Sequence, residues 1–264
     1  MHRITSLLLA LAACGGSDRA GTASPPPPPP PQQPEPAPIA RGPAAAPATP
    51  TITAYVRGPL ATADLATARI DHDRVAKGGQ GPGAALGDTG HHVFLATGET
   101  GNAKDEFLAL DEWTNADGPR QLYANPDFQA AFKPLFAKPT APELYRRRPD
   151  WVTWGDLQPP PGGKPYWVLI VKGHLAKATE AENKAAHDKV ASTFEAIAKQ
   201  SGDFAHVPHL AVDDPRIFFN VDASTNHDAM LAMMKNPDFQ KAFSALFDAP
   251  PEVHLYRSTD WYQW

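Results

Sequence analysis

The chain has 264 residues, of which 42% are hydrophobic and 20% charged, so it can bury the core of one or two domains. A formal net charge of −5 argues against nucleic-acid binding, because phosphate contacts need a concentrated basic surface. Nearly half of its 30 prolines lie between residues 25 and 50, so the proline excess belongs to one segment rather than to the folded part.

Residues 1–13 predict a secretory signal peptide. Arg3 is followed by an apolar run from residue 4 to residue 11 and then by small residues, which is the layout of such a signal. A permanent membrane span needs roughly 20 apolar residues. The run is therefore too short to span, and we expect it to be an export signal.

The only cysteine, Cys14, follows Leu-Ala-Ala, and this stretch resembles a bacterial lipobox. The resemblance implies that Cys14 is acylated, so that membrane lipid is a partner of the chain and the protein is anchored in the cell envelope. Gly15, in place of the Asp found in some sorted lipoproteins, indicates the outer membrane. The alternative is an ordinary signal peptide with a chance or buried thiol.

Residues 14–50 predict a disordered Pro/Ala-rich linker. Their composition cannot bury enough apolar surface to fold, and proline favours extended polyproline II. We interpret the segment as a stalk that holds the folded part away from the membrane. It is also compatible with binding to a proline-recognition domain.

The folded part is one unit written twice, with matching segments in the same order in both halves. Between the halves, residues 157–163 are rich in proline and glycine and predict a linker, which gives domains over residues 51–156 and 164–264. The matching pairs are Val56-Arg57-Gly58 with Val171-Lys172-Gly173, His72-Asp73 with His187-Asp188, Gly87-Asp88 and His91 with Gly202-Asp203 and His206, Asn125-Pro126-Asp127-Phe128 with Asn236-Pro237-Asp238-Phe239, and Asp150-Trp151 and Trp154 with Asp260-Trp261 and Trp264.

Each half predicts the order strand, helix, strand, strand, helix, strand. Thr179 and Glu182 form a capping box at the start of the first helix of the second half. Asn125 and Asn236, each followed by proline, predict a restart within the second helix of each half. The strands are expected at residues 51–56, 92–97, 106–113 and 143–147, and at 166–171, 208–212, 216–222 and 253–257.

This order predicts an α+β fold class. Two tandem ferredoxin-like (βαββαβ) domains would pack sheet against sheet and form an intrachain pseudo-dimeric α/β barrel. Because the second copy covers the open sheet face of the first, we expect the chain to be a monomer.

Short stretches of the third strand and second helix share a pattern between the halves. They are Asp111-Glu112-Trp113, Leu122 and Asn125-Pro126-Asp127-Phe128 in the first half, and Asp222, Asn236, Pro237 and Phe239 in the second. The second half keeps the pattern except at Ser224, which stands where the first half has Trp113. These stretches resemble the antibiotic biosynthesis monooxygenase-like family of dimeric α/β barrels.

The resemblance implies a small cavity between each sheet and its helices, and, in some members, oxidation of polyphenolic or quinone-like substrates without metal or flavin. Two departures weigh against catalysis. Leu122 and Met233 stand where many members carry a histidine, and Phe132 and Phe243 stand where the haem-degrading branch carries its iron ligand. We therefore do not expect haem, and no cofactor is predicted.

The candidate catalytic residues lie in the first half. His72 shares a helical face with apolar residues, and Asp111 and Trp113 project from one face of a strand. We assign His72 as the base, with Asp111 and Trp113 orienting a substrate. The alternatives are a hydrogen-bonded core histidine and a core-filling indole. His187, Asp222 and Tyr55 are the candidate ligand-binding residues.

Metal binding is a further reading, because His91 is next to His92 and His206 lies near His209. Adjacent strand residues point to opposite faces, and no cysteine completes a ligand set, so no metal site is predicted.

The expected function is an envelope lipoprotein that binds a small aromatic or apolar molecule, as a cofactor-independent monooxygenase or, alternatively, as a non-catalytic structural or protein-interaction module.

Overall fold

A computed structural model describes residues 51–264. The predicted signal peptide, Cys14 and the predicted stalk lie outside the described residues. No helix within residues 51–264 is both long and apolar enough to span a bilayer.

The predicted elements are present in both halves. In the first half, the order is β1 (Ile52–Gly58), α1 (Leu65–Ala85), β2 (Asp88–Ala96), β3 (Phe107–Trp113), α2 (Asp117–Ala124), α3 (Pro126–Phe132), the 3-10 turn η1 (Lys133–Leu135) and β4 (Glu143–Arg147). In the second half, it is β5 (Trp167–His174), α4 (Glu180–Gln200), β6 (Asp203–Ala211), β7 (Ile217–Ser224), α5 (His227–Lys235), α6 (Pro237–Ser244) and β8 (Glu252–Ser258).

The predicted helix caps are confirmed. Thr179 and Glu182 form the capping box of α4. The side chain of Asn125 accepts hydrogen bonds from the first backbone amides of α3, and Asn236 does the same for α6. In both halves this cap separates two short helices, because the asparagine itself has extended backbone angles.

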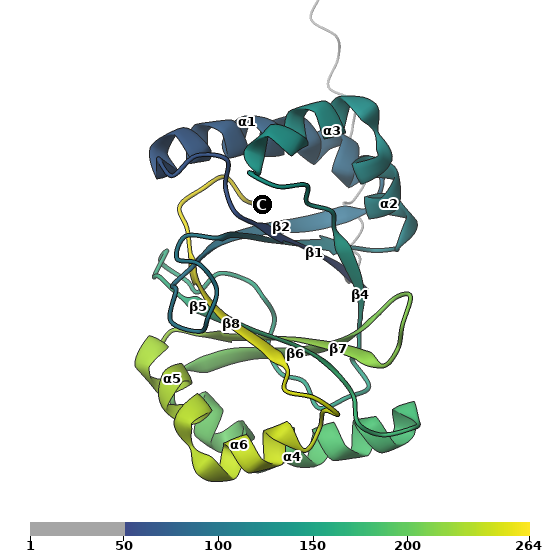
Figure 1. The fold of residues 1–264 in the computed structure, drawn as a ribbon, viewed down its shortest axis with the longest axis vertical. Helices are drawn as coiled ribbons and strands as arrows, with labels where there is room; N and C mark the ends of the chain where they lie inside the picture. The colour runs from purple at the N-terminus through teal and green to yellow at the C-terminus, as the bar shows by residue number, and fades with distance from the viewer. Residues whose placement is uncertain (1–50) are drawn as a thin grey trace, which may run out of the picture. The chain divides into compact units, whose positions relative to one another are not determined.

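The predicted fold class is wrong. Two tandem ferredoxin-like domains with separate sheets are not formed, because all eight strands join one antiparallel sheet that closes into a barrel in the order β1-β3-β2-β8-β5-β7-β6-β4. Figure 1 shows the strands in the middle, with α1 to α3 on one side and α4 to α6 on the other. The domain boundaries at residues 156 and 164 stay a prediction.

The physical reason is that the edge strands of each half need hydrogen-bond partners. An unpaired edge leaves backbone N–H and C=O groups without partners. In the barrel, β2 pairs with β8 through Phe94 and Ser258, and β4 pairs with β6 through Tyr145 and Ala211. The two halves are therefore joined by hydrogen bonds along their edges, whereas the sequence analysis expected contact between sheet faces.

The core has an inner and an outer part. The barrel interior is filled by aromatic and aliphatic side chains of both halves, including Tyr55, Phe94 and Phe219. Leu157, at the start of the predicted linker, belongs to the same cluster. Two further clusters lie between the barrel wall and the helices, one in each half, and the polar groups described next lie beside them.

Candidate functional site

A chain of hydrogen-bonded side chains runs between α1 and the barrel wall in the first half. His72 on α1 meets His91 on β2 with 3.1 Å between their Nε2 atoms. The Nδ1 atom of His91 lies 2.5 Å from Oδ1 of Asp111 on β3. At the other end, Nδ1 of His72 lies 3.0 Å from the carboxylate of Asp73. We call these four residues the first relay.

The second half repeats this arrangement. His187 on α4 and His206 on β6 lie 3.2 Å apart through their Nε2 atoms, and His206 lies 2.5 Å from Asp222 on β7. His187 also contacts the carboxylate of Asp188, at 3.1 Å. We call these four residues the second relay.

Burial holds the helix histidine of each relay in its neutral form. Burial lowers the pKa of His72 to about 4, and that of His187 likewise to about 4. At neutral pH each of these two imidazoles is therefore uncharged and carries a single ring proton.

A second carboxyl group stands beside each relay. Burial, together with the neighbouring charge of Asp111, raises the pKa of Asp88 to about 8. Burial and the charge of Asp222 raise the pKa of Asp203 to about 8 in the same way. At neutral pH both groups are largely protonated, so each site combines a neutral helix imidazole with a carboxylic acid.

Each relay opens onto a small cavity between the helices and the barrel wall. The first-half cavity has about 50 Å³ and is lined by His72, Asp88, His91 and Asp111, with mainly apolar residues around them. The second-half cavity has about 100 Å³ and is lined by the equivalent His187, Asp203, His206 and Asp222. An apolar cavity with a few convergent polar groups is the usual form of a small-molecule site, and these two lie at the small end of that range.

The tail of each half covers the relay of the other half. After β8, the chain returns to α1, where Trp261 packs on His72 with 5.2 Å between ring centroids and Trp264 stacks on His91 at 4.6 Å. After β4, Trp151 and Trp154 pack in the same way on His187 and His206, at 4.9 Å and 4.4 Å. The repeated Asp-Trp segment of the sequence is thus an exchanged lid.

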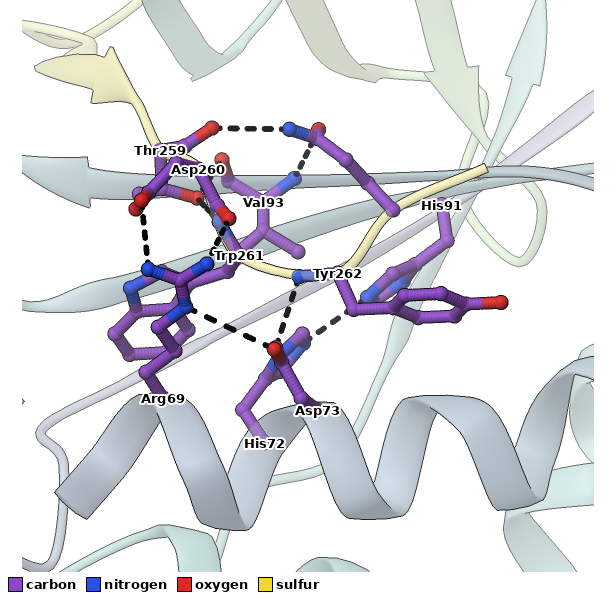
Figure 2. A network of polar contacts seen from close by, with 10 residues as sticks. Arg69, His72, Asp73, His91, Val93, Thr259, Asp260, Trp261 and Tyr262 are labelled. Atoms are coloured by element: carbon purple, nitrogen blue, oxygen red, sulfur yellow. Dashed lines mark hydrogen bonds and ion pairs between the residues drawn. The ribbon is translucent and has the colours of Figure 1, made fainter. Parts of the chain in front are cut away.

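Hydrogen bonds fix the first of these lids to α1. Arg69 donates to the side chain of Asp260 at 2.6 Å and to its backbone carbonyl at 2.8 Å. The backbone amide of Tyr262 donates to Asp73 at 2.8 Å, so the lid also contacts the end of the first relay. Figure 2 shows this network, with the lid lying across the helix that carries His72.

The structure brings together only some of the predicted site residues. Asp111 is linked to His72 through His91, and Asp222 is linked to His187 through His206. Trp113 is fully buried beside Ile52 and does not line the cavity.

Tyr55 also lies apart from both relays. It points into the barrel interior, where its ring packs against Tyr145 and Phe219. The assigned ligand-binding residues therefore fall into two separate places, Tyr55 inside the barrel and His187 with Asp222 beneath the helices.

The partners that complete the relays were not predicted from the sequence. His91 and His206 were considered only as metal ligands, and Tyr123, whose hydroxyl donates to Asp111 at 2.9 Å, was not considered. The two histidines could have been found from the repeat, because His91 matches His206 as His72 matches His187. Within residues 51–264, no group of three or more His, Cys, Asp or Glu side chains is arranged to hold a metal ion.

Several solved structures share this fold. A proposed monooxygenase of Lactobacillus acidophilus has a TM-score of 0.52 and 14% identity, covering 80% of this chain and 95% of its own. One of Fusobacterium nucleatum has a TM-score of 0.58 and 8% identity, covering 81% and 96%. An anthrone oxidase-like protein has a TM-score of 0.57 and 13% identity, covering 81% and 92%.

At such identities the likeness is one of fold. It supports the resemblance to the monooxygenase-like family at that level. No protein-family model and no curated protein matches the sequence.

Proposed function

We propose that this chain binds a small aromatic or apolar molecule under its helices and oxidises it with molecular oxygen, as a monooxygenase-like protein without a bound cofactor. The observation that carries the proposal is the duplicated histidine–histidine–aspartate relay, which meets an apolar cavity in each half. Such a relay can take a proton from an acidic C–H or O–H bond and return it, which is the work of a general acid–base pair.

The proposed reaction converts an activated CH₂ group into a carbonyl. The relay takes one proton from carbon, and the resulting carbanion forms a C–O bond with O₂; the relay then returns the proton to the peroxide oxygen. Breaking the second C–H bond and the O–O bond releases one water and leaves C=O. The substrate loses four electrons and O₂ gains four, so oxygen is the only co-reactant.

Oxygen uptake tests this proposal. Added to anthrone-type ketones and other aromatic compounds with an activated CH₂ group, the purified protein should consume one oxygen molecule for each carbonyl group formed. The double variant Asp111→Asn/Asp222→Asn, which alters both relays, should lower the rate about 100-fold or more, because general acid–base groups contribute about 10²–10⁴-fold. The matched control is Asp228→Asn, since the Asp228 side chain is 96% exposed and its loss should leave the rate unchanged.

The alternative function is a non-catalytic structural or protein-interaction module of the cell envelope. It is favoured by the size of the first-half cavity, which at about 50 Å³ has room for about three to five water molecules at ~10–15 Å³ each. Binding of small aromatics without oxygen uptake across the substrate panel would select this alternative.

We also propose that Cys14 anchors the protein in the bacterial envelope, in the outer membrane. Two or three acyl chains hold a protein firmly, since each buried methylene contributes about 0.8 kcal/mol. Cys14→Ser in the full-length chain should therefore move the protein from the membrane pellet to the soluble fraction of its host. Retention of the variant in the pellet, with a washed wild-type pellet as reference, would rule out this anchor.

A further inference from the structure

The two halves differ at one residue that contacts the relay in the first half only. Tyr123, two residues before the helix cap Asn125, corresponds to Met234, two residues before Asn236. The Tyr123 hydroxyl donates to Oδ2 of Asp111 at 2.9 Å, on the carboxylate oxygen that does not contact His91. Met234 has no hydroxyl, so the equivalent oxygen of Asp222 receives no such bond from its helix.

The first-half site thus already contains a phenol. The Tyr123 ring meets Phe128 and Phe132 edge-on, each with 5.3 Å between ring centroids. In the second half, the equivalent Phe239 and Phe243 keep the same mutual stacking, at 5.2 Å and 17° compared with 5.7 Å and 20°. The aromatic walls of a phenol site are therefore preserved where the built-in phenol is missing.

The second-half cavity also has more room. Its 100 Å³ is about twice the first-half volume and holds about seven to ten water molecules at ~10–15 Å³ each, against seven non-hydrogen atoms in a phenol. One cause is visible in the repeat, because the buried indole of Trp113 corresponds to the small side chain of Ser224.

Polar atoms without partners line this cavity. Asn220, which is 2% exposed, has no hydrogen-bond partner for Oδ1, and Oδ1 of Asp203 has none either. A buried acceptor left without a donor destabilises the site, because it has lost its hydrogen bonds to water and gained none in return. In the first half, Ala109 occupies the position of Asn220 and carries no polar side-chain atom. The second-half cavity therefore contains buried polar atoms that favour a ligand with a hydroxyl group over a purely apolar one.

We propose that the second-half cavity binds one small monophenol, whose hydroxyl donates to Oδ2 of Asp222 as that of Tyr123 donates to Asp111, and whose ring lies against Phe239 and Phe243. The first half binds none, because Tyr123 occupies the equivalent place. This specifies the ligand class and the working half of the function proposed above and rests on it, although binding is separable from oxidation.

Calorimetric titration with 4-methylphenol tests the inference through stoichiometry. The wild-type protein should bind one molecule per chain. Met234→Tyr should abolish binding, because the phenol ring of the introduced tyrosine would occupy the ligand's place. Met234→Leu, the matched control, keeps the size and apolarity of Met234 and should bind as the wild type does. Tyr123→Met should add a second site. If Met234→Tyr does not fold, Met234→Phe blocks the same space.

Toluene distinguishes a cavity that recognises the ligand hydroxyl from one that binds any small apolar ring. It has the shape of 4-methylphenol without the oxygen, so its affinity should be at least about tenfold weaker, because it makes no hydrogen bond to Oδ2 of Asp222. Equal affinity for the two probes, absence of 4-methylphenol binding, or binding that is indifferent to Met234→Tyr would each overturn the inference.

The oxygen measurement keeps the two proposals apart. Suppose that the protein binds one 4-methylphenol per chain, that Met234→Tyr loses this binding, and that no substrate gives oxygen uptake. This result would contradict the proposed oxidation and support the phenol site. Oxygen uptake on other substrates with no 4-methylphenol binding would sink the phenol site alone.

Discussion

Trp261→Ala is expected to lower the free energy of unfolding by about 3–5 kcal/mol, the usual cost of truncating a buried tryptophan. Trp261 is 6% exposed, and its ring lies 5.2 Å from that of His72 and 6.0 Å from that of Phe107. The indole belongs to the lid that the second half contributes to the first. Its loss therefore both leaves a void above the first relay and loosens a connection between the halves.

Urea unfolding followed by circular dichroism measures this change. The matched control is Ile70→Ala, because Ile70 lies on the same helix as His72 but is 69% exposed, and such surface changes stay within about 0.5 kcal/mol. If both variants lost the same small amount of stability, the lid would be a passive covering rather than part of the core.

The local structure of this chain could be predicted from its sequence. The capping box at Thr179 and the caps at Asn125 and Asn236 are short-range features, in which one side chain reaches backbone amides two or three residues away. The repeat supported each of these predictions, because a pattern that is clear in one half locates the equivalent residues in the other half. His72 and His187 were found in this way.

The closure of the barrel could not be predicted in the same way. The pairing of Phe94 with Ser258 joins residues far apart in sequence, and neither residue carries a local mark of its partner. From the sequence, the open face of each sheet was expected to need cover and to receive it from the face of a second sheet. In the structure the backbone hydrogen bonds of the edges themselves decide the arrangement.

The strand residues of the candidate site show the same limit. Asp111 and Trp113 share a face of β3, as the period of two requires, yet α2 and its cap pass above Trp113, and only Asp111 reaches the cavity. His91 was recognisable as a member of the repeat, but its role depends on α1 bringing His72 within 3.1 Å. The spacing of residues along the chain does not indicate which side chains of different elements come into contact.

Residues 51–156 expressed alone are expected to self-associate into a dimer. The isolated half would expose two edges, β2 and β4, which in the whole chain pair with β8 and β6. Because β6 matches β2 and β8 matches β4 in the repeat, β2 of one copy can pair with β4 of a second copy, twice over. The segment that carries Trp151 and Trp154 would then cover the relay of the other copy, as it does in the whole chain.

Light scattering coupled to size-exclusion chromatography gives the mass of this fragment, with residues 51–264, which hold both halves in one chain, as the reference. A dimer, or a mixture of dimer and aggregate, is the expected outcome, since two uncovered edges are also templates for further pairing. A stable monomer with native-like helix and strand content would show that the edge hydrogen bonds are dispensable. The halves would then be self-sufficient domains that the chain merely tethers, and the exchange of lids would contribute little to their stability.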